Sequence, residues 1–197
     1  VVYKNNTINK AVKYAERHTL NNKILIEEYL EGPDLSLVSF VENSKLFPIC
    51  LLEEINYENG DGSIFPKGYR TLKKDFFSLE KNAHKIAKKI ISKFKIVRSP
   101  LMISFRRDTK NNLKIIEVHL DIGGDLLIET FVPKALSFDF LKLAVEISIG
   151  QVRLPKSLNV RPVAIFYRDG KVTEKGLKTI TSKSNKSLDK KILNYNI

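Results

Sequence analysis

The sequence contains a single cysteine and lacks any apolar run long enough to cross a membrane. One cysteine excludes an internal disulfide, and the apolar neighbours of Cys50 in Phe47–Leu52 favour a buried, unreactive thiol. A membrane helix needs about 20 consecutive apolar residues, which no segment approaches, and the first residues lack the pattern of a secretory signal peptide. We therefore expect a protein of the reducing cytoplasm that has no membrane partner.

Motifs of nucleic-acid-binding proteins are also missing. Zinc-finger spacing, a helix-turn-helix and an RNA-recognition signature are absent, and few basic residues lie beside aromatic residues. The net charge of +12 still admits anionic partners such as nucleotide phosphates, acidic metabolites or nucleic acid. Because the basic residues are scattered and mostly lysine, we interpret most of this charge as solvated surface. A basic nucleic-acid-binding module is kept as an alternative, but nucleic acid is not the expected partner.

Apolar residues are plentiful enough for a globular core, at 43% of the 197 residues. Hydrophobic periodicity and turn signals predict an α+β chain whose neighbouring strands pair locally and antiparallel. The expected helices are Ile8–His18, a helix from Asp75 or Ser78 to Phe94, a short helical part of Leu126–Ala135, and Ser137–Ile149. The expected strands are Lys23–Leu30, Asp34–Glu42, Leu46–Ile55, Leu101–Arg107, Leu113–Asp121, Arg161–Tyr167 and Lys171–Leu177.

Proline and glycine qualify this outline at two places. Pro48 predicts that its strand lies at a sheet edge or carries a bulge. Tyr57–Leu72 contains several glycines and a proline and is predicted to be a loop. This loop is either a lid whose Lys67 and Arg70 meet an anionic substrate, or an ordinary surface loop.

Two further details concern turns and the last helix. Asn43-Ser44 and Asp169-Gly170 are expected to connect antiparallel strands as tight turns. The helix over Ser137–Ile149 is expected to end at a glycine. Its predicted apolar face consists of Phe140, Leu141, Ala144, Val145 and Ser148.

The chemically richest stretch reads LKIIEVHLDIGGD, residues 113–125. Its apolar start predicts a buried strand, and the period of two then places Glu117, His119 and Asp121 on one face. Such groups are costly to bury without partners, so we expect them to line a cleft, hold a cation, or both. The pair Gly123-Gly124 allows a sharp turn and a close approach of the backbone to a ligand.

Four stretches in order resemble the ATP-grasp superfamily, especially its amino-acid ligase and carbamoyl-phosphate-synthase-like branches. They are ILIEEYLEGPDLSLVSF, similar to a hinge and the strand after it; LKIIEVHLDIGGD, similar to the metal-binding strand; LLIETFVPKALSFDFLKLAVEISIG, similar to the segment that follows; and RPVAIFYRDGKV, similar to a closing strand pair. The likeness covers about residues 1–177.

This resemblance implies an antiparallel ATP-grasp-like sheet with flanking helices. It implies that residues 1–150 form the C-terminal lobe of an ATP-grasp domain and that residues 151–197 begin a small β-rich subdomain with a basic tail. The family's N-terminal domain and its phosphate-covering glycine-rich loop would precede Val1. We therefore expect the chain to be a fragment that is inactive alone.

The resemblance also implies how a nucleotide would bind. Glu27–Leu30 would be the hinge, whose backbone at Glu28 and Leu30 would meet the adenine edge, with Tyr29 beside it. Asp34 would accept from the ribose hydroxyls. Ile116 would pack on the adenine ring. The cofactor-binding positions implied in this way are Glu27, Glu28, Tyr29, Leu30, Asp34 and Ile116.

The implied metal-binding residues are Glu117, His119 and Asp121, which would face Mg²⁺ and the phosphates. Two positions depart from the family pattern. Ser104 stands where the family usually has another metal-binding carboxylate, and we expect it to lie near Glu117 across a hairpin. Asp121 stands where an arginine is usual, so it is interpreted either as a compensating ligand or as a sign that phosphoryl transfer is lost.

The implied function is part of an ATP-dependent carboxylate–amine (or thiol) ligase that acts through an acyl phosphate. Its cofactors would be ATP and Mg²⁺, and its partners a small-molecule carboxylate and amine. The alternative is a degenerate, non-catalytic ATP-grasp scaffold, for which Ser104 and Asp121 are the evidence. The sequence names neither the substrate nor the oligomeric state, and a homodimer is one option.

Overall fold

The computed structural model describes residues 7–21, 23–58, 64–72, 77–124, 126–151, 158, 160–168, 171–172 and 178–179. Its helices are α1 (Ile8–Glu16), α2 (Phe77–Phe94), the π-helix η3 (Leu127–Phe131), α3 (Val132–Leu136) and α4 (Phe140–Ser148). Its strands are β1 (Asp34–Glu42), β2 (Lys45–Glu58), β3 (Ile64–Thr71), β4 (Arg98–Arg107), β5 (Leu113–His119), β6 (Val163–Arg168), β7 (Lys171–Val172) and β8 (Lys178–Thr179).

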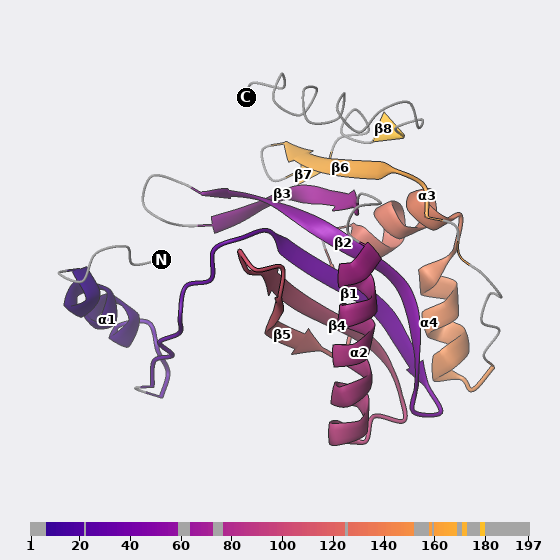
Figure 1. Ribbon diagram of the computed structural model, residues 1–197, viewed down its shortest axis with the longest axis horizontal. Coiled ribbons are helices and arrows are strands. Elements are labelled where there is room, and N and C mark those ends of the chain that lie inside the picture. The colour runs from indigo at the N-terminus through magenta and orange to yellow at the C-terminus, as the bar shows by residue number, and fades with distance from the viewer. Residues whose placement is uncertain are drawn as a thin grey trace.

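The strands form an antiparallel sheet in the order β5-β4-β1-β2-β3-β6-β7, and β8 also pairs with β6 (Figure 1). The predicted α+β class, with locally paired strands and flanking helices, is therefore confirmed. The hairpin from β4 to β5 and the one from β6 to β7 were also predicted, although the turn at 169–170 lies outside the described residues. Because β6 pairs with β3, the sheet continues across the expected boundary at residue 150, and that division stays a prediction.

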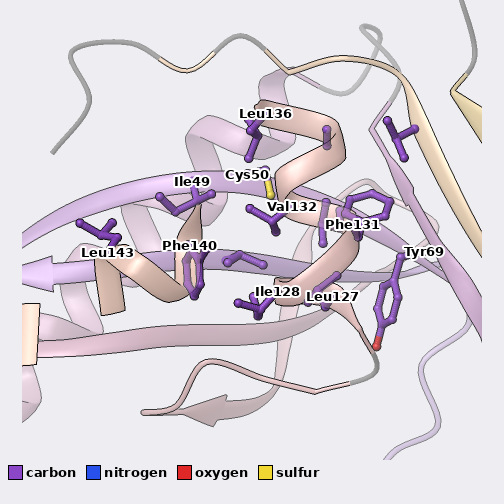
Figure 2. Close-up of a cluster of buried hydrophobic side chains, with 14 of the residues drawn as sticks. Ile49, Cys50, Tyr69, Leu127, Ile128, Phe131, Val132, Leu136, Phe140 and Leu143 are labelled. Carbon is purple, nitrogen blue, oxygen red and sulfur yellow. The ribbon is translucent and has the colours of Figure 1, made fainter. Parts of the chain in front are cut away.

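Helices cover both faces of the sheet. Leu35, Leu37 and Val41 of β1 belong to the apolar cluster beneath α2, whereas Val38 and Phe40 belong to the cluster beneath η3, α3 and α4. Figure 2 shows this second cluster, in which the side chains of the helices meet those of β2 and β3. The central seven residues of β1 are all buried because each face of the strand has its own cover.

Two local predictions on β1 and β2 are confirmed. Asn43 and Ser44 have φ of 50° and 58°, and Glu42 faces Lys45, as a two-residue hairpin turn requires. Pro48 pairs with β1 on one side, whereas β3 pairs only with Leu52–Glu58 of β2 and does not reach Pro48. The register also shifts between Val38 and Ser39, which confirms the bulge.

The loop predicted over Tyr57–Leu72 is wrong for most of its length, because β3 pairs with both β2 and β6. Pro66 lies where the β2–β3 register shifts, which is a position that tolerates proline. Gly68 has φ of 153°, and a Cβ added there would lie 1.9 Å from the Ile165 carbonyl oxygen. These residues accommodate a bulge and a close strand approach rather than a loop, and residues 59–63 lie outside the described part.

The strand predicted over Lys23–Leu30 is also wrong. This segment has no strand structure, and Leu25 and Ile26 are exposed. An apolar run becomes a strand only where a neighbouring strand completes its hydrogen bonds, and the described chain brings none beside it. The predicted helix α1 does form, but none of its residues is buried, and it lies apart from the sheet in Figure 1.

β5 is less buried than predicted. Leu113 is buried, but Ile115 and Ile116 are exposed, and the strand ends at His119 rather than Asp121. β5 is an edge strand of the described sheet. Leu113 is its only apolar residue that belongs to the cluster beneath α2. The expectation of a buried strand therefore fails because an apolar run does not reveal that its strand lies at an edge.

The last helix buries a different face from the predicted one. Its buried residues are Phe140, Leu143 and Ile147, whereas Leu141 and Val145 are exposed. The helix is apolar at so many positions that two stripes satisfy helical spacing, and contact with the sheet selects one of them. The helix begins at Phe140 rather than Ser137, and the Asp139 carboxylate caps it by accepting a hydrogen bond from the Lys142 N–H at 2.9 Å. Across the described residues, no helix is both long and apolar enough for a membrane span.

Candidate functional site

A polar area occupies one end of the sheet face that carries η3 and α4. Along β1 the residues on this face are Asp34, Ser36, Val38 and Phe40, so the face changes from polar to apolar within one strand. The β1–β4 register extends the polar area, because Ser36 faces Ser104 and Asp34 faces Arg106. On β5, Glu117 lies opposite Ser104, as predicted. We call this area the polar half of the face.

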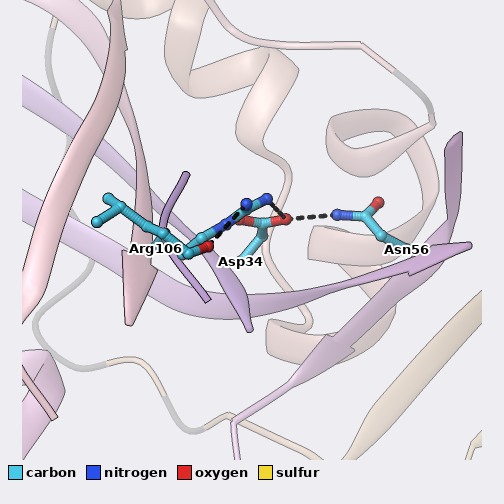
Figure 3. A network of polar contacts seen from close by, with 4 residues as sticks. Asp34, Asn56 and Arg106 are labelled. Atoms are coloured by element: carbon cyan, nitrogen blue, oxygen red, sulfur yellow. Dashed lines mark hydrogen bonds and ion pairs between the residues drawn. The ribbon is translucent and has the colours of Figure 1, made fainter. Parts of the chain in front are cut away.

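An arginine joins the polar half to the segment before β1 (Figure 3). The Arg106 guanidinium donates from Nε and Nη2 to the two carboxylate oxygens of Asp34, both at 2.6 Å. Asn56 Nδ2 also donates to Asp34, at 2.7 Å. Hydrogen bonding to Asp34 raises the pKa of Arg106 above its usual value, and burial opposes this in part.

The same guanidinium reaches the predicted hinge. Arg106 Nη1 donates to the Leu30 carbonyl at 3.0 Å, and the guanidinium carbon lies 5.6 Å from the centre of the Tyr29 ring. The structure thus brings Tyr29, Leu30 and Asp34 together, whereas Glu27 and Glu28 are exposed. Sequence reasoning missed Arg106, although its spacing of two from Ser104 on a predicted strand was a usable signal.

The segment after the hinge is fixed against the end of β4. The Arg107 N–H donates to the Pro33 carbonyl at 3.0 Å. Gly32 has φ of 135°, and a Cβ added there would lie 1.7 Å from the Arg107 carbonyl oxygen, so only glycine fits without a backbone shift. Arg106 and Arg107 therefore fix the backbone between Leu30 and β1 at two carbonyls, those of Leu30 and Pro33.

Glu117, His119 and Asp121 lie along one side of β5 and the residues after it, as predicted. His119 Nε2 lies 3.1 Å from Glu117 Oε1, and His119 Nδ1 lies 3.7 Å from Asp121 Oδ2. The Glu117 side chain is 57% exposed, and Asp121 Oδ1 accepts from the Gly123 N–H at 2.9 Å. The Gly123 turn packs against Met102, which lies 2.4 Å from an added Cβ, so its close approach is to a side chain of the protein.

These side chains fit a metal ion that is brought by a ligand better than one held by the protein alone. Among the described residues, no group of three His, Cys, Asp or Glu side chains is arranged to hold an ion. Mg²⁺ is commonly bound through one or two carboxylates together with substrate phosphates. Glu117, with the Ser104 hydroxyl opposite it, matches that smaller contribution.

The basic residues predicted for a lid lie on β3 instead. Arg70 Nε and Nη2 donate to the Glu53 carboxylate at 2.9 Å and 2.7 Å, in a bidentate pair across β2 and β3. The charge of Arg70 is therefore compensated inside the sheet. Cys50 is buried as expected, and burial raises the pKa of its thiol, which disfavours a nucleophilic role.

Comparison with known proteins yields no matching family model and no matching curated protein. Among solved structures, the chain resembles an L-amino acid ligase from Bacillus licheniformis, with a TM-score of 0.68, 16% identity, and coverage of 84% of this chain and 43% of that one. It resembles a phosphoribosylglycinamide synthetase from Anaerococcus prevotii, with a TM-score of 0.61, 16% identity, and coverage of 82% and 40%.

A third similar structure is the biotin carboxylase domain of a Hydrogenobacter thermophilus 2-oxoglutarate carboxylase in complex with MgADP, ADP and bicarbonate. Its TM-score is 0.60 at 13% identity, and coverage is 79% of this chain and 34% of that one. The chain thus spans less than half the length of the structures it matches. At these identities the likeness establishes the fold, and these structural neighbours are all ATP-grasp enzymes. The chain therefore forms part of an ATP-grasp fold, as its sequence motifs predicted.

Proposed function

We propose that this chain forms one wall of the nucleotide site of an ATP-dependent ligase, which joins a carboxylate to an amine or thiol through an acyl phosphate. The observation that carries the proposal is the polar half of the face, which lies in an ATP-grasp fold and is tied to the hinge by Arg106. Similar solved structures include a ligase and a carboxylase domain with bound MgADP, which supports the nucleotide and its metal.

Adenine would meet the hinge backbone. Among the described contacts, neither the Glu28 carbonyl nor the Leu30 N–H has a hydrogen-bond partner. An acceptor and a donor of this kind complement the amino group and the ring nitrogen at the edge of adenine. Ile116, which is 50% exposed, offers an apolar surface for the base. Asp34 accepts three hydrogen bonds, so about one of its four lone-pair positions remains for a ribose hydroxyl.

The phosphates would lie beside β5. Glu117 would hold Mg²⁺ together with phosphate oxygens, His119 would orient the Glu117 carboxylate through their contact of 3.1 Å, and Asp121 would face the same ion. When bound, Mg²⁺ neutralises charge on the transferred phosphoryl group. The Ser104 hydroxyl opposite Glu117 supplies a weaker oxygen donor than a carboxylate would.

Calorimetry on the intact protein tests this proposal. We expect saturable, Mg²⁺-dependent binding of ATP and ADP. Glu117→Gln should weaken the Mg²⁺-dependent part, because it removes the charge and keeps the shape. The control is Glu146→Gln on α4, where the carboxylate lies 3.9 Å from Lys142 and outside the polar half. Absence of saturable ATP binding by the intact wild-type protein would refute the proposed function.

A non-catalytic ATP-grasp scaffold is the second candidate, and the Asp121 hydrogen bond to the Gly123 N–H favours it because a turn needs no catalytic role. Turnover of ATP with panels of carboxylates and amines separates the two candidates. Loss of turnover in folded Glu117→Ala protein supports the ligase. For Asp121→Ala, weaker Mg²⁺-dependent ATP binding supports a metal-facing role, and unchanged or tighter binding rejects that role.

A basic nucleic-acid-binding module is the third candidate. The only structural feature that favours it in the described chain is the solvent side of α2. Its lysines form no ion pair there: Lys81, Lys85, Lys88, Lys89 and Lys93. Binding to duplex or single-stranded nucleic acid that weakens steeply with salt would support this candidate, and salt-insensitive or absent binding would remove it.

A further inference from the structure

Arg106 contacts the hinge and the sheet with a single planar group. Two of its nitrogens donate to Asp34 on β1, and a third donates to the Leu30 carbonyl at 3.0 Å. The side chain is only 15% exposed. A guanidinium presents its donors in a fixed plane, so the Asp34 pair determines where the Nη1 donor points. The position of the Leu30 carbonyl is therefore coupled to the strand pair β1–β4.

The same two strands carry a second pair that lacks this extra contact. At their other end Arg98 donates from Nε and Nη2 to Glu42, both at 2.7 Å, and Glu42 faces Arg98 in the register. Arg98 is 42% exposed, and in the described chain it bonds to no segment outside the strand pair. A bidentate bridge between β1 and β4 therefore forms without any third partner, so the Leu30 contact is an additional feature of Arg106.

The Leu30 carbonyl accepts a hydrogen bond from Arg106, so it is not available to a base. This hydrogen bond is stronger than one between neutral groups, because its donor is charged. The groups left for a base are the Glu28 acceptor and the Leu30 donor, which complement adenine. Guanine presents an acceptor and a donor in the opposite order, so it would place like groups against each other.

We propose that Arg106 is a positioning residue that sets base selectivity: it holds the Leu30 carbonyl, and this restrains the backbone at Leu30 in the orientation with which the hinge accepts adenine and rejects guanine. This inference rests on the proposed nucleotide site. Arg106 touches neither the base nor the phosphates in this scheme. It acts on the base through the hinge backbone, and its pair with Asp34 reaches only the ribose, which ADP and GDP share. Its loss should therefore change the ratio of adenine to guanine affinity without changing affinity for the phosphate chain.

The test measures dissociation constants of MgADP, MgGDP and magnesium tripolyphosphate for the intact protein by calorimetry. Arg106→Lys keeps the charge beside Asp34 but cannot bridge Asp34 and Leu30 in one plane. We expect MgADP to bind about tenfold more weakly to this variant, as loss of one charged hydrogen bond predicts. Binding of tripolyphosphate should stay close to the wild-type value, and MgGDP binding should weaken less than MgADP binding, because guanine does not use the hinge pattern. Arg106→Ala should show the same change in selectivity.

Arg98→Lys is the matched control, because it alters a bidentate pair on the same strands and should leave the ADP-to-GDP ratio unchanged. Arg106 variants that keep the wild-type ratio overturn the inference, and so does an equal loss of ADP and tripolyphosphate binding, which marks a purely structural role. If Arg106→Ala does not fold, Arg106→Lys decides. Wild-type protein that binds tripolyphosphate but discriminates no base overturns the inference and leaves the phosphate site standing, whereas wild-type protein that binds neither overturns the proposed function itself.

Discussion

The two halves of one sheet face differ in side chains but not in backbone. Val38 and Phe40 of β1 pack beneath the helices, whereas Asp34 and Ser36 on the same face lie among polar groups of β4. The strands are continuous through both halves. The side chains of the apolar half are buried against the helices of the same chain. In the polar half, Glu117 and His119 are accessible to solvent, and Arg106 connects this half to the hinge.

This contrast indicates a division of labour along each strand. Burial of the apolar half supplies much of the free energy of folding, because apolar area removed from water is the dominant favourable contribution. The polar half gains little from packing and is positioned by the strands that the apolar half stabilises. Substitutions should therefore separate stability from ligand binding according to the half in which they lie.

The largest effect on stability is expected in the apolar half. The centre of the Phe140 ring on α4 lies 4.5 Å from the centre of the Phe40 ring, and Phe140 is fully buried. Phe140→Ala should lower the free energy of unfolding by about 3–5 kcal/mol, through lost burial and a cavity. Urea titration measures this loss, and Phe140→Leu should lose less. Under folding conditions the affinity for MgADP should be unchanged, and a large change in affinity would break the proposed division.

Asp34→Ala should have the next largest effect, because it combines both roles. The change leaves Arg106, which is largely buried, without its carboxylate, and should cost about 2 kcal/mol of stability. Glu42→Ala, at the more exposed end of the same strand pair, should cost less. Urea titration of both variants compares the two ends. Equal losses would show that the Arg106–Asp34 pair stabilises the protein no more than the exposed Arg98–Glu42 pair does.

Local patterns account for the parts of the fold that sequence reasoning predicted. The alternation of Asp34–Glu42 and the turn at Asn43-Ser44 lie within a few residues of each other, so a hairpin follows from neighbouring residues alone. The group of Glu117, His119 and Asp121 was predictable for the same reason, because the period of two needs only one strand.

Features that depend on distant segments were not predictable. Asp34 and Arg106 are 72 residues apart, and β1 pairs with β4 only after β2, β3 and α2 have intervened. No local signal specifies that register. The exposed Lys23–Leu30 segment fails for a related reason: its apolar residues resemble a strand, but pairing requires a neighbour that a local pattern does not supply.

A substitution at Ser104 tests whether the polar half binds a metal ion. Ser104 lies opposite Glu117 on the β4–β5 pair. Ser104→Asp places two carboxylates together, which should cost less than about 1 kcal/mol of stability through like-charge repulsion. If the site binds Mg²⁺ with a nucleotide, the same change should tighten MgADP binding several-fold, since a carboxylate is a better Mg²⁺ ligand than a hydroxyl.

The controls for this change are Ser104→Asn, which adds similar volume without charge, and Ser104→Ala. Calorimetry with and without Mg²⁺ identifies the metal-dependent part of the affinity. Tighter binding by Ser104→Asn as well would assign the gain to shape rather than to metal coordination. No gain in Ser104→Asp, with stability reduced as expected, would argue that the nucleotide phosphates lie away from β5.

The smallest effect is expected on the opposite face, at His84 of α2. Burial lowers the pKa of His84; Glu80 raises it and Lys88 lowers it further. Its Nε2 is buried without a hydrogen-bond partner in the described chain. The unfolded chain therefore binds a proton on this imidazole at higher pH than the folded chain, and the free energy of unfolding should fall as the pH drops below about 6.5.

Urea titrations at about pH 7.5 and about pH 5 measure this dependence, and His84→Gln isolates it, because carboxylates contribute equally to both proteins. The variant should lose less stability than the wild type between the two pH values. Since α2 covers the face opposite to the polar half, the His84 substitution should leave MgADP affinity unchanged at both pH values. A shift in affinity that follows His84 would show that the two faces of the sheet are coupled, and would contradict the assignment of ligand binding to the polar half alone.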